Sequence, residues 1–253
     1  MKKLLPFAAA AALLVSCNNA ETFSIEGSFN IPESFQLGDT VIERGPIEGS
    51  VYLIGLDNEP IDSVEITDDK FQFTGVVDKK KPYIAYLACD YAIGMLVIEP
   101  GEIKVEMSEQ VVATGTPTND GITQMNDGAE EISNRLYDEL YALRQDGNDA
   151  MSDSLLMPLY LQYSQLLSSY IDSIYTANKD NLLGVYAANL QTSQIQSAEE
   201  LESVLSEYSE YVRNSELMQA RIQYYKSVYE DEGNPNETDL SDLTEDLLEG
   251  SKE

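Results

Sequence analysis

The stretch Ala92-Ile93-Gly94-Met95-Leu96-Val97-Ile98-Glu99-Pro100-Gly101-Glu102-Ile103-Lys104-Val105-Glu106-Met107 is the clearest sign of the fold. Its first seven residues form an almost continuous apolar run. Glu99 to Glu102 has the composition of a turn. After the turn, apolar Ile103, Val105 and Met107 alternate with charged residues, the period-two pattern of a half-buried strand. The stretch therefore predicts a strand, a turn and a second strand.

The same pattern repeats towards the N-terminus. Apolar residues alternate from Phe23 to Phe29 and again from Val64 to Phe73, with Asp68-Asp69 as a turn, and two nearly continuous apolar runs occupy Val51–Leu56 and Tyr83–Cys89. Short strands with turn signals every eight to twelve residues are typical of an antiparallel sandwich or barrel. We therefore predict an antiparallel β-sandwich over residues 23–120.

The apolar period changes to that of a helix after about residue 120. Helical spacing is shown by Ile132, Leu136, Leu140 and Leu143, and by Leu155, Leu159, Tyr163, Leu166, Tyr170 and Ile174. A short helix is expected over 182–190. Ser197-Ala198-Glu199-Glu200 is a capping box that predicts a helix reaching Val212, and Leu217 to Val228 predicts the last one. An all-helical region over 121–230 makes the chain an α+β protein.

The two ends of the chain read as segments outside this fold. Lys2 and Lys3 precede an apolar run, Leu4 to Val15, that is shorter than the about 20 residues of a membrane-spanning helix. The run closes on Leu14-Val15-Ser16-Cys17, which resembles a bacterial lipoprotein signal. We expect a signal peptide at 1–16, lipid on Cys17 and a tether at 17–22; an ordinary secretory signal is the alternative. The acidic residues 231–253 are expected to form a disordered, solvated tail.

Charge and composition limit the function. Without Lys2 and Lys3, the 15 basic residues fall to 13, against 45 acidic ones. Such a charge repels the phosphates of nucleic acid, and it also repels an anionic membrane surface, so lipid must provide the anchoring. The expected location is the cell envelope, at the outer membrane facing the periplasm.

Catalytic and metal-binding motifs are missing from the sequence. The chain has no His, so the usual serine and cysteine nucleophiles lack their base and zinc loses its commonest ligand. Gly115-Thr116-Pro117 has neither the glycines nor the lysine of a phosphate loop. Asp146–Asp153 resembles a calcium loop, but Met157 stands where an EF-hand needs Glu. We therefore expect no cofactor, no dedicated metal site and no catalytic residue.

Two features leave a binding role open. Tyr160, Tyr163 and Tyr170 follow helical spacing, which suits either an aromatic platform for glycan or ordinary core packing. Cys89 is the one thiol left when Cys17 carries lipid. We read it as a small buried apolar residue, with a reactive thiol as the alternative.

Five segments of the chain resemble the N-terminal domain of unknown function DUF4369, found in lipoproteins of Bacteroidetes. They are Phe23-Ser24-Ile25-Glu26-Gly27, Ile61-Asp62-Ser63, Lys70-Phe71-Gln72-Phe73-Thr74-Gly75, Val97-Ile98-Glu99-Pro100-Gly101-Glu102-Ile103 and Gly115-Thr116-Pro117-Thr118-Asn119-Asp120. The resemblance covers roughly residues 23–125. In many members a thioredoxin-like domain follows the helices. After Tyr229 this chain has only its acidic tail and no CxxC, so no redox residue is carried over.

These observations favour a non-catalytic, lipid-anchored module of the envelope that binds a protein partner. The alternatives are a glycan- or peptide-binding lipoprotein, and an accessory of thiol–disulfide exchange working with a separate protein. An interaction module should show a broad apolar patch, and a ligand-binding protein should show a cleft with converging Tyr and carboxylates. A redox accessory requires Cys89 to be accessible.

Overall fold

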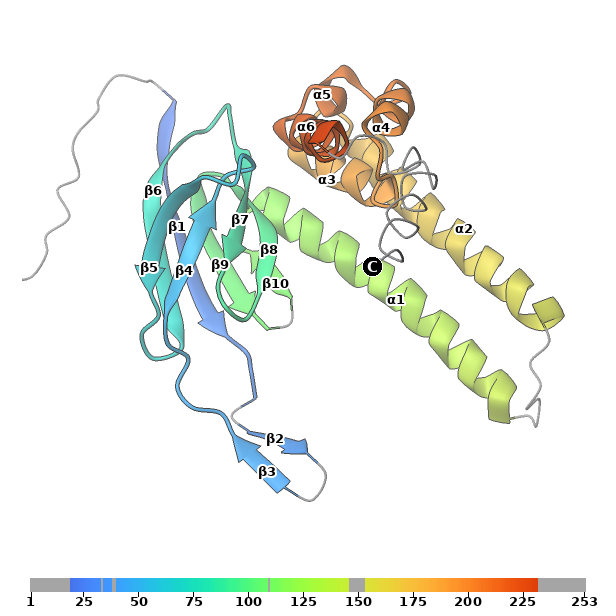
Figure 1. The fold of residues 1–253 in the computed structure, drawn as a ribbon, viewed down its shortest axis with the longest axis horizontal. Coiled ribbons are helices and arrows are strands. Elements are labelled where there is room, and N and C mark those ends of the chain that lie inside the picture. Colours follow the sequence, from blue (N-terminus) through green and yellow to red (C-terminus); the bar gives the residue numbers. More distant parts are fainter. Residues whose placement is uncertain (1–18, 33, 38–39, 109, 146–152, 232–253) are drawn as a thin grey trace, which may run out of the picture.

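Two facing four-stranded sheets dominate the described N-terminal region, and helices follow them in the described residues after 116 (Figure 1). The computed structural model describes residues 19–32, 34–37, 40–108, 110–145 and 153–231. The predicted signal peptide, Cys17 and nearly all of the predicted acidic tail lie outside these residues. The fold class is confirmed as α+β, with a β-rich N-terminal region followed by helices.

The first sheet has the strand order β10-β9-β1-β6. Its strands are β1 (Ala20–Phe29), β6 (Lys70–Asp78), β9 (Gly101–Met107) and β10 (Val111–Thr114). β1 pairs antiparallel with β6 but parallel with β9, so Ile25 lies between Phe73 and Ile103. The parallel pair departs from the purely antiparallel sandwich that the sequence predicted, because alternation of side chains does not reveal strand direction.

The second sheet is antiparallel throughout, in the order β5-β4-β7-β8. Its strands are β4 (Ser50–Ile54), β5 (Pro60–Glu65), β7 (Tyr83–Ala88) and β8 (Ile93–Ile98). The predicted turn at Glu99-Pro100 crosses from β8 in this sheet to β9 in the other. A two-stranded hairpin, β2 (Ser34–Leu37) with β3 (Thr40–Glu43), projects separately and was not predicted.

The inner faces of the two sheets enclose one apolar core. It holds alternate residues of both sheets, among them Ile25, Leu53, Phe73, Leu87, Leu96 and Ile103. β7 and β8 are also covered on their outer face, where Ile84 and Val97 pack with residues of the helices. Burial on both faces explains why these two strands are continuous apolar runs instead of alternating ones.

In the part of the chain that the structure describes, six helices follow the sheets. They are α1 (Pro117–Gln145), α2 (Asp153–Asn178), α3 (Leu182–Gln191), α4 (Ala198–Leu205), α5 (Glu210–Arg213) and α6 (Glu216–Asp231). α1 and α2 form a long antiparallel hairpin that extends away from the sandwich, while α3 to α6 gather beside β7 and β8 (Figure 1).

The boundaries of two predicted helices and of the first strand differ from the prediction. The expected capping box is present, since the Ser197 hydroxyl accepts a hydrogen bond from the Glu200 amide, but the helix it starts ends at Leu205. Ser209 then caps the separate helix α5, so the predicted helix up to Val212 is two helices. α1 begins at Pro117, four residues before the predicted boundary, and β1 begins at Ala20, inside the predicted tether.

Two of the motifs that carry the family resemblance meet where α1 leaves the sandwich. The side-chain amide of buried Asn119 accepts a hydrogen bond from the Val97 N–H (2.9 Å) and donates one to the Val97 carbonyl (2.8 Å). The Glu99 carboxylate accepts bonds from the N–H and the hydroxyl of Thr118, both 2.8 Å, in the first turn of α1. The motif residues therefore join the helical region to the edge of the sandwich.

Candidate functional site

The predicted tyrosine platform does not share one exposed face. Tyr163 is 4% exposed, and its hydroxyl donates to the Glu139 carboxylate of α1; this hydrogen bond raises the pKa of Tyr163 above its ordinary value. The Tyr170 hydroxyl donates to the Gln124 carbonyl, also in α1. Tyr160 alone is largely exposed, at 46%. Two of the three tyrosines thus hold α2 against α1, as the packing alternative expected.

A large hollow lies along the α1–α2 hairpin, with the end of α3 as its floor and Gln110 and Val112 of the sandwich also in its lining. We call this the hairpin groove; its volume is about 1150 Å³. One face of α1 lines it with residues spaced three and four apart, from Thr123 through Asp127 and Glu130 to Tyr137. α2 contributes Ser164, Leu167, Ser168 and Ile171, and the floor includes Tyr186, Leu190, Gln191 and Tyr208.

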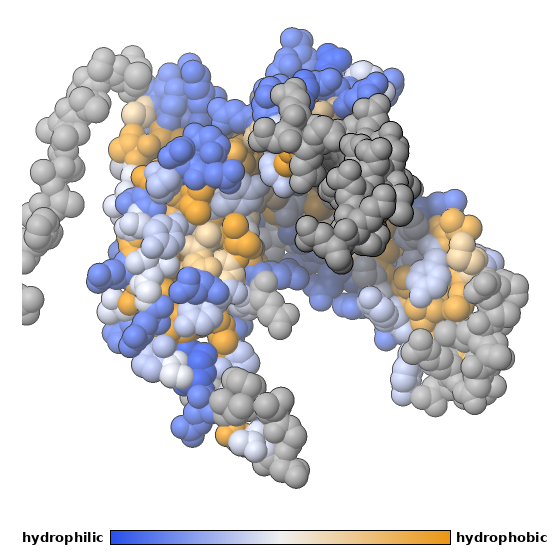
Figure 2. All heavy atoms as spheres, viewed as in Figure 1, coloured by the Kyte–Doolittle hydropathy of each residue, from blue (hydrophilic) through white to orange (hydrophobic). Residues whose placement is uncertain are grey.

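Exposed aromatic residues continue both walls of the groove towards the tip of the hairpin. Tyr141 lies one helical turn beyond Tyr137, and Tyr160 lies one turn before Ser164, so each shares the face of its groove-lining neighbour. Tyr163 bonds to Glu139 and Tyr170 to Gln124, and this antiparallel register places Tyr141 opposite Tyr160. Apolar side chains gather at this end of the hairpin in Figure 2.

The exposure of these residues is unusually high for large side chains. Tyr137 is 68% exposed, Tyr141 64% and Leu161 56%. Sequence reasoning did not single out Tyr137 or Tyr141. The available signal was their position off the stripe formed by Leu136, Leu140 and Leu143, which predicts that they point away from the α1–α2 contact.

All the charged side chains that line the groove are acidic. Asp127 and Glu130 line it, and no Lys or Arg is among its lining residues. The remaining polar groups are amides and hydroxyls, such as Asn126, Asn134 and Gln194. The groove is therefore suited to a neutral or basic occupant with apolar side chains.

A smaller hollow of about 680 Å³ lies between the β6–β7 turn and the starts of α3, α5 and α6. Its inner wall is apolar, with Leu56, Ile84, Val185 and Leu217. The β6–β7 turn contributes Lys80 and Lys81 to the lining, and the helical region contributes Asp180, Glu210 and Glu216. We call it the turn pocket. Burial raises the pKa of Tyr83 and of Tyr211, which both line it.

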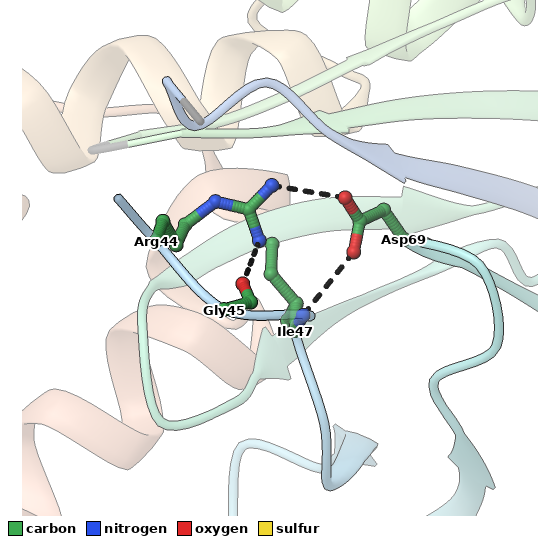
Figure 3. A network of polar contacts seen from close by, with 4 residues as sticks. All are labelled: Arg44, Gly45, Ile47 and Asp69. Atoms are coloured by element: carbon green, nitrogen blue, oxygen red, sulfur yellow. Dashed lines mark hydrogen bonds and ion pairs between the residues drawn. The ribbon is translucent and has the colours of Figure 1, made fainter. Parts of the chain in front are cut away.

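Arg44 and Asp69 form a polar network at the base of the β2–β3 hairpin (Figure 3). The guanidinium donates to the Asp69 carboxylate (2.9 Å), which also accepts the Ile47 N–H (3.2 Å). The hydrogen bond from Arg44 is the main reason why the pKa of Asp69 lies below its ordinary value. The network fixes the segment that leads from β3 to buried Ile47, a structural role.

Arg221 also has its partners within the fold. Its guanidinium donates to the Asn189 side chain, to the Thr192 hydroxyl and to the Thr192 carbonyl, at 3.0, 2.8 and 2.9 Å. A cation at the C-terminal carbonyls of a helix complements the helix dipole. Arg221 thus caps α3 and is not directed towards a ligand.

The remaining sequence candidates are placed as follows. Cys89 is partly buried against the sandwich core, and its N–H donates to the Ala92 carbonyl.

Among the described residues there is no group of three or more His, Cys, Asp or Glu side chains able to hold a metal ion. No helix in that part of the chain is long and apolar enough to cross a membrane. The predicted lipid attachment at Cys17 and most of the weighed calcium loop lie outside it.

Comparison with known proteins finds a family model that matches part of the chain. Residues 40–121 match the model described as Domain of unknown function (DUF4369). The match runs from β3 into the first turn of α1, so it includes the joint made by Glu99 and Asn119. No curated protein and no solved structure matches the chain. The family resemblance is confirmed over the matched residues.

Proposed function

We propose that this chain is a lipid-anchored protein of a Bacteroidetes cell envelope that binds a partner protein through the hairpin groove, without catalysis. The anchor is lipid on Cys17, at the outer membrane and facing the periplasm. The observation that carries the binding role is the exposed aromatic and apolar residues that extend the groove, Tyr137 and Tyr141 on α1 and Tyr160 with Leu161 on α2.

Exposed aromatic residues of this kind are typical of protein interfaces. Tyr is enriched among the residues that dominate binding energy, and a groove between two helices accepts an amphipathic segment. The absence of Lys and Arg from the groove lining favours a partner segment that carries positive charge beside its apolar side chains. This charge preference also argues against docking of the acidic tail of the chain into its own groove.

The proposed lack of catalysis is supported by the buried polar residues, which form hydrogen bonds within the fold. The sequence has no His. The buried polar side chains Glu99, Asn119, Thr116 and Thr192 all take part in hydrogen bonds of the fold. These hydrogen bonds stabilise helix ends and strand edges, so the four side chains are not free to act on a substrate.

Capture of partners from envelope tests the proposal when it is combined with a groove variant. The double change Tyr137→Ala and Tyr141→Ala should weaken binding of a partner by about thirtyfold or more, the effect of losing one strong aromatic anchor. Tyr224→Ala is the matched control, because Tyr224 on α6 is 61% exposed and is not among the residues that line the groove. Equal recovery of the same partner by both variants would contradict the proposal.

A glycan or peptide ligand is the second candidate, favoured by the polar inner part of the groove. There Asn126, Gln191 and Gln194 offer amides beside Tyr186 and Tyr208, and Asp127 and Glu130 offer carboxylates. Two results together would favour this candidate. The capture experiment recovers no protein partner, and the protein binds on glycan or peptide arrays in a way that Tyr186→Ala abolishes. Loss of a partner on Cys89→Ser alone would instead favour the redox accessory.

A further inference from the structure

The start of the first strand lies beside the lysine-rich β6–β7 turn. The Lys79 N–H donates to the Asn19 carbonyl (3.0 Å), and the Lys79 ammonium pairs with Glu21 (2.8 Å). Residues 79 to 81 are three consecutive lysines. Both features lie where β1 begins, at the top of the view in Figure 1.

The length of the chain limits how far the proposed anchor can be from the start of β1. Cys17 is two residues before Asn19, a distance of at most about 7 Å along an extended chain. Because β1 begins at Ala20, three of the six residues of the predicted tether, 20–22, belong to the first strand. A lipid on Cys17 would therefore hold the β6–β7 turn against the membrane surface.

Two of the lysines are free to contact that surface. Neither the Lys80 nor the Lys81 ammonium has a hydrogen-bond or ion-pair partner in the part of the chain that the structure describes. Both lysines reach the turn pocket from the β6–β7 turn, and three carboxylates, Asp180, Glu210 and Glu216, reach it from the helical region. Because the opposite charges belong to different elements, a headgroup that carries both signs can contact both.

We propose that the turn pocket binds the zwitterionic headgroup of an aminophospholipid in the anchoring membrane. This proposal rests on the proposed lipid anchor at Cys17. The phosphate pairs with Lys80 and Lys81, and the primary ammonium donates hydrogen bonds to the carboxylates of Asp180, Glu210 and Glu216. The upper part of an acyl chain contacts Leu56 and Leu217. The carboxylates disfavour a purely anionic headgroup, because they repel it.

The arrangement also gives the body a fixed orientation. In Figure 1, α1 and α2 extend sideways and downwards from the sandwich, so their far ends lie away from the end of the sandwich at which β1 begins. With the turn pocket on the membrane, the far end of the hairpin groove therefore points away from that surface. The headgroup contact therefore presents the groove to the space beyond the membrane.

Hydrogen–deuterium exchange of the full lipidated protein tests this contact. The protein is placed in vesicles of phosphatidylcholine alone, or with phosphatidylethanolamine or phosphatidylglycerol added. Phosphatidylethanolamine should slow exchange in 79–84 and 210–217 by about fivefold, equivalent to two ion pairs of about 0.5 kcal/mol each. Phosphatidylcholine has the same charges but no N–H to donate, so its effect should be smaller.

Matched variants assign the effect to the pocket. The double change Lys80→Ala and Lys81→Ala should remove the slowing, and Lys226→Ala, a surface lysine paired with Glu202, should leave it unchanged. Equal exchange in all three vesicles, or a larger effect of phosphatidylglycerol, would overturn the headgroup site.

The mass of the N-terminal peptide separates this failure from failure of the anchor. Lipid on Cys17 without protection of the turn pocket overturns the headgroup site alone. Absence of lipid on Cys17 overturns the anchor and, with it, the headgroup site.

Discussion

At the scale of single residues, Asn119 acts as a substitute for a neighbouring strand. β8 is the edge of its sheet, and the Asn119 amide pairs with both the N–H and the carbonyl of Val97 while it also donates to the Thr116 hydroxyl. Asn119 is 1% exposed. We expect Asn119→Ala to lower the free energy of unfolding by about 2–4 kcal/mol, because two buried backbone groups lose their partners. Urea denaturation measures the loss.

Asn134→Ala gives the matched control for Asn119→Ala. Asn134 lies in the same helix but is exposed, so its removal should change stability by less than about 0.5 kcal/mol. Similar midpoints for the two variants would show that the Asn119 bonds do not hold α1 to the sandwich. This joint is where two of the segments behind the family resemblance meet, which gives that resemblance a structural reason.

At the scale of elements, the turn between α2 and α3 depends on a glycine. A Cβ on Gly184 would lie 2.0 Å from the Asn178 carbonyl oxygen, a backbone atom that cannot move without shifting α2. We expect Gly184→Ala to cost about 1–3 kcal/mol of unfolding free energy through overpacking, despite the better helix propensity of Ala. Thermal or urea unfolding is the measurement.

Gly121→Ala in α1 is the informative comparison for Gly184→Ala. Its Cβ would meet only the tip of the flexible Leu183 side chain, at 2.8 Å. The gain in helix propensity, up to about 1 kcal/mol, should then offset or exceed the small repacking cost. A Gly184→Ala protein as stable as Gly121→Ala would mean that α3 can slide on α2 without penalty.

The success of sequence reasoning also differs by element. Alternation of apolar and polar residues located strands such as Phe71–Phe73 and Ile103–Met107, because one face of each strand is buried in the core and the other is not. Capping chemistry located the start of α4 at Ser197. Alternation carries no information on strand direction, so the parallel β1–β9 pair was missed. The tyrosines were ambiguous because a Tyr in a helix has the same spacing whether it meets the neighbouring helix, as Tyr163 does, or solvent, as Tyr160 does. Tertiary contact decides between the two.

At the scale of the whole molecule, the hairpin is supported unevenly along its length. Near the sandwich, Ile122 and Met125 of α1 are buried against the helical region and the outer face of β8. The 29-residue α1 is about 44 Å long, so its far half reaches well past the sandwich and is packed against α2. Local opening should therefore begin at the tip.

Hydrogen exchange along α1 follows from this uneven support. We expect amides at 137–145 to exchange at least about a hundredfold faster than amides at 121–128, a difference of about 2.7 kcal/mol in opening free energy. Binding of a partner in the hairpin groove should slow exchange most at the amides of 137–145. Near the sandwich α3 packs against both α1 and α2, and the partner would take the place of α3 at the far end of the hairpin. Uniform protection along α1 without a partner would show that the hairpin is rigid by itself, and the exposed walls at Tyr141 and Tyr160 would then need no occupant to be ordered.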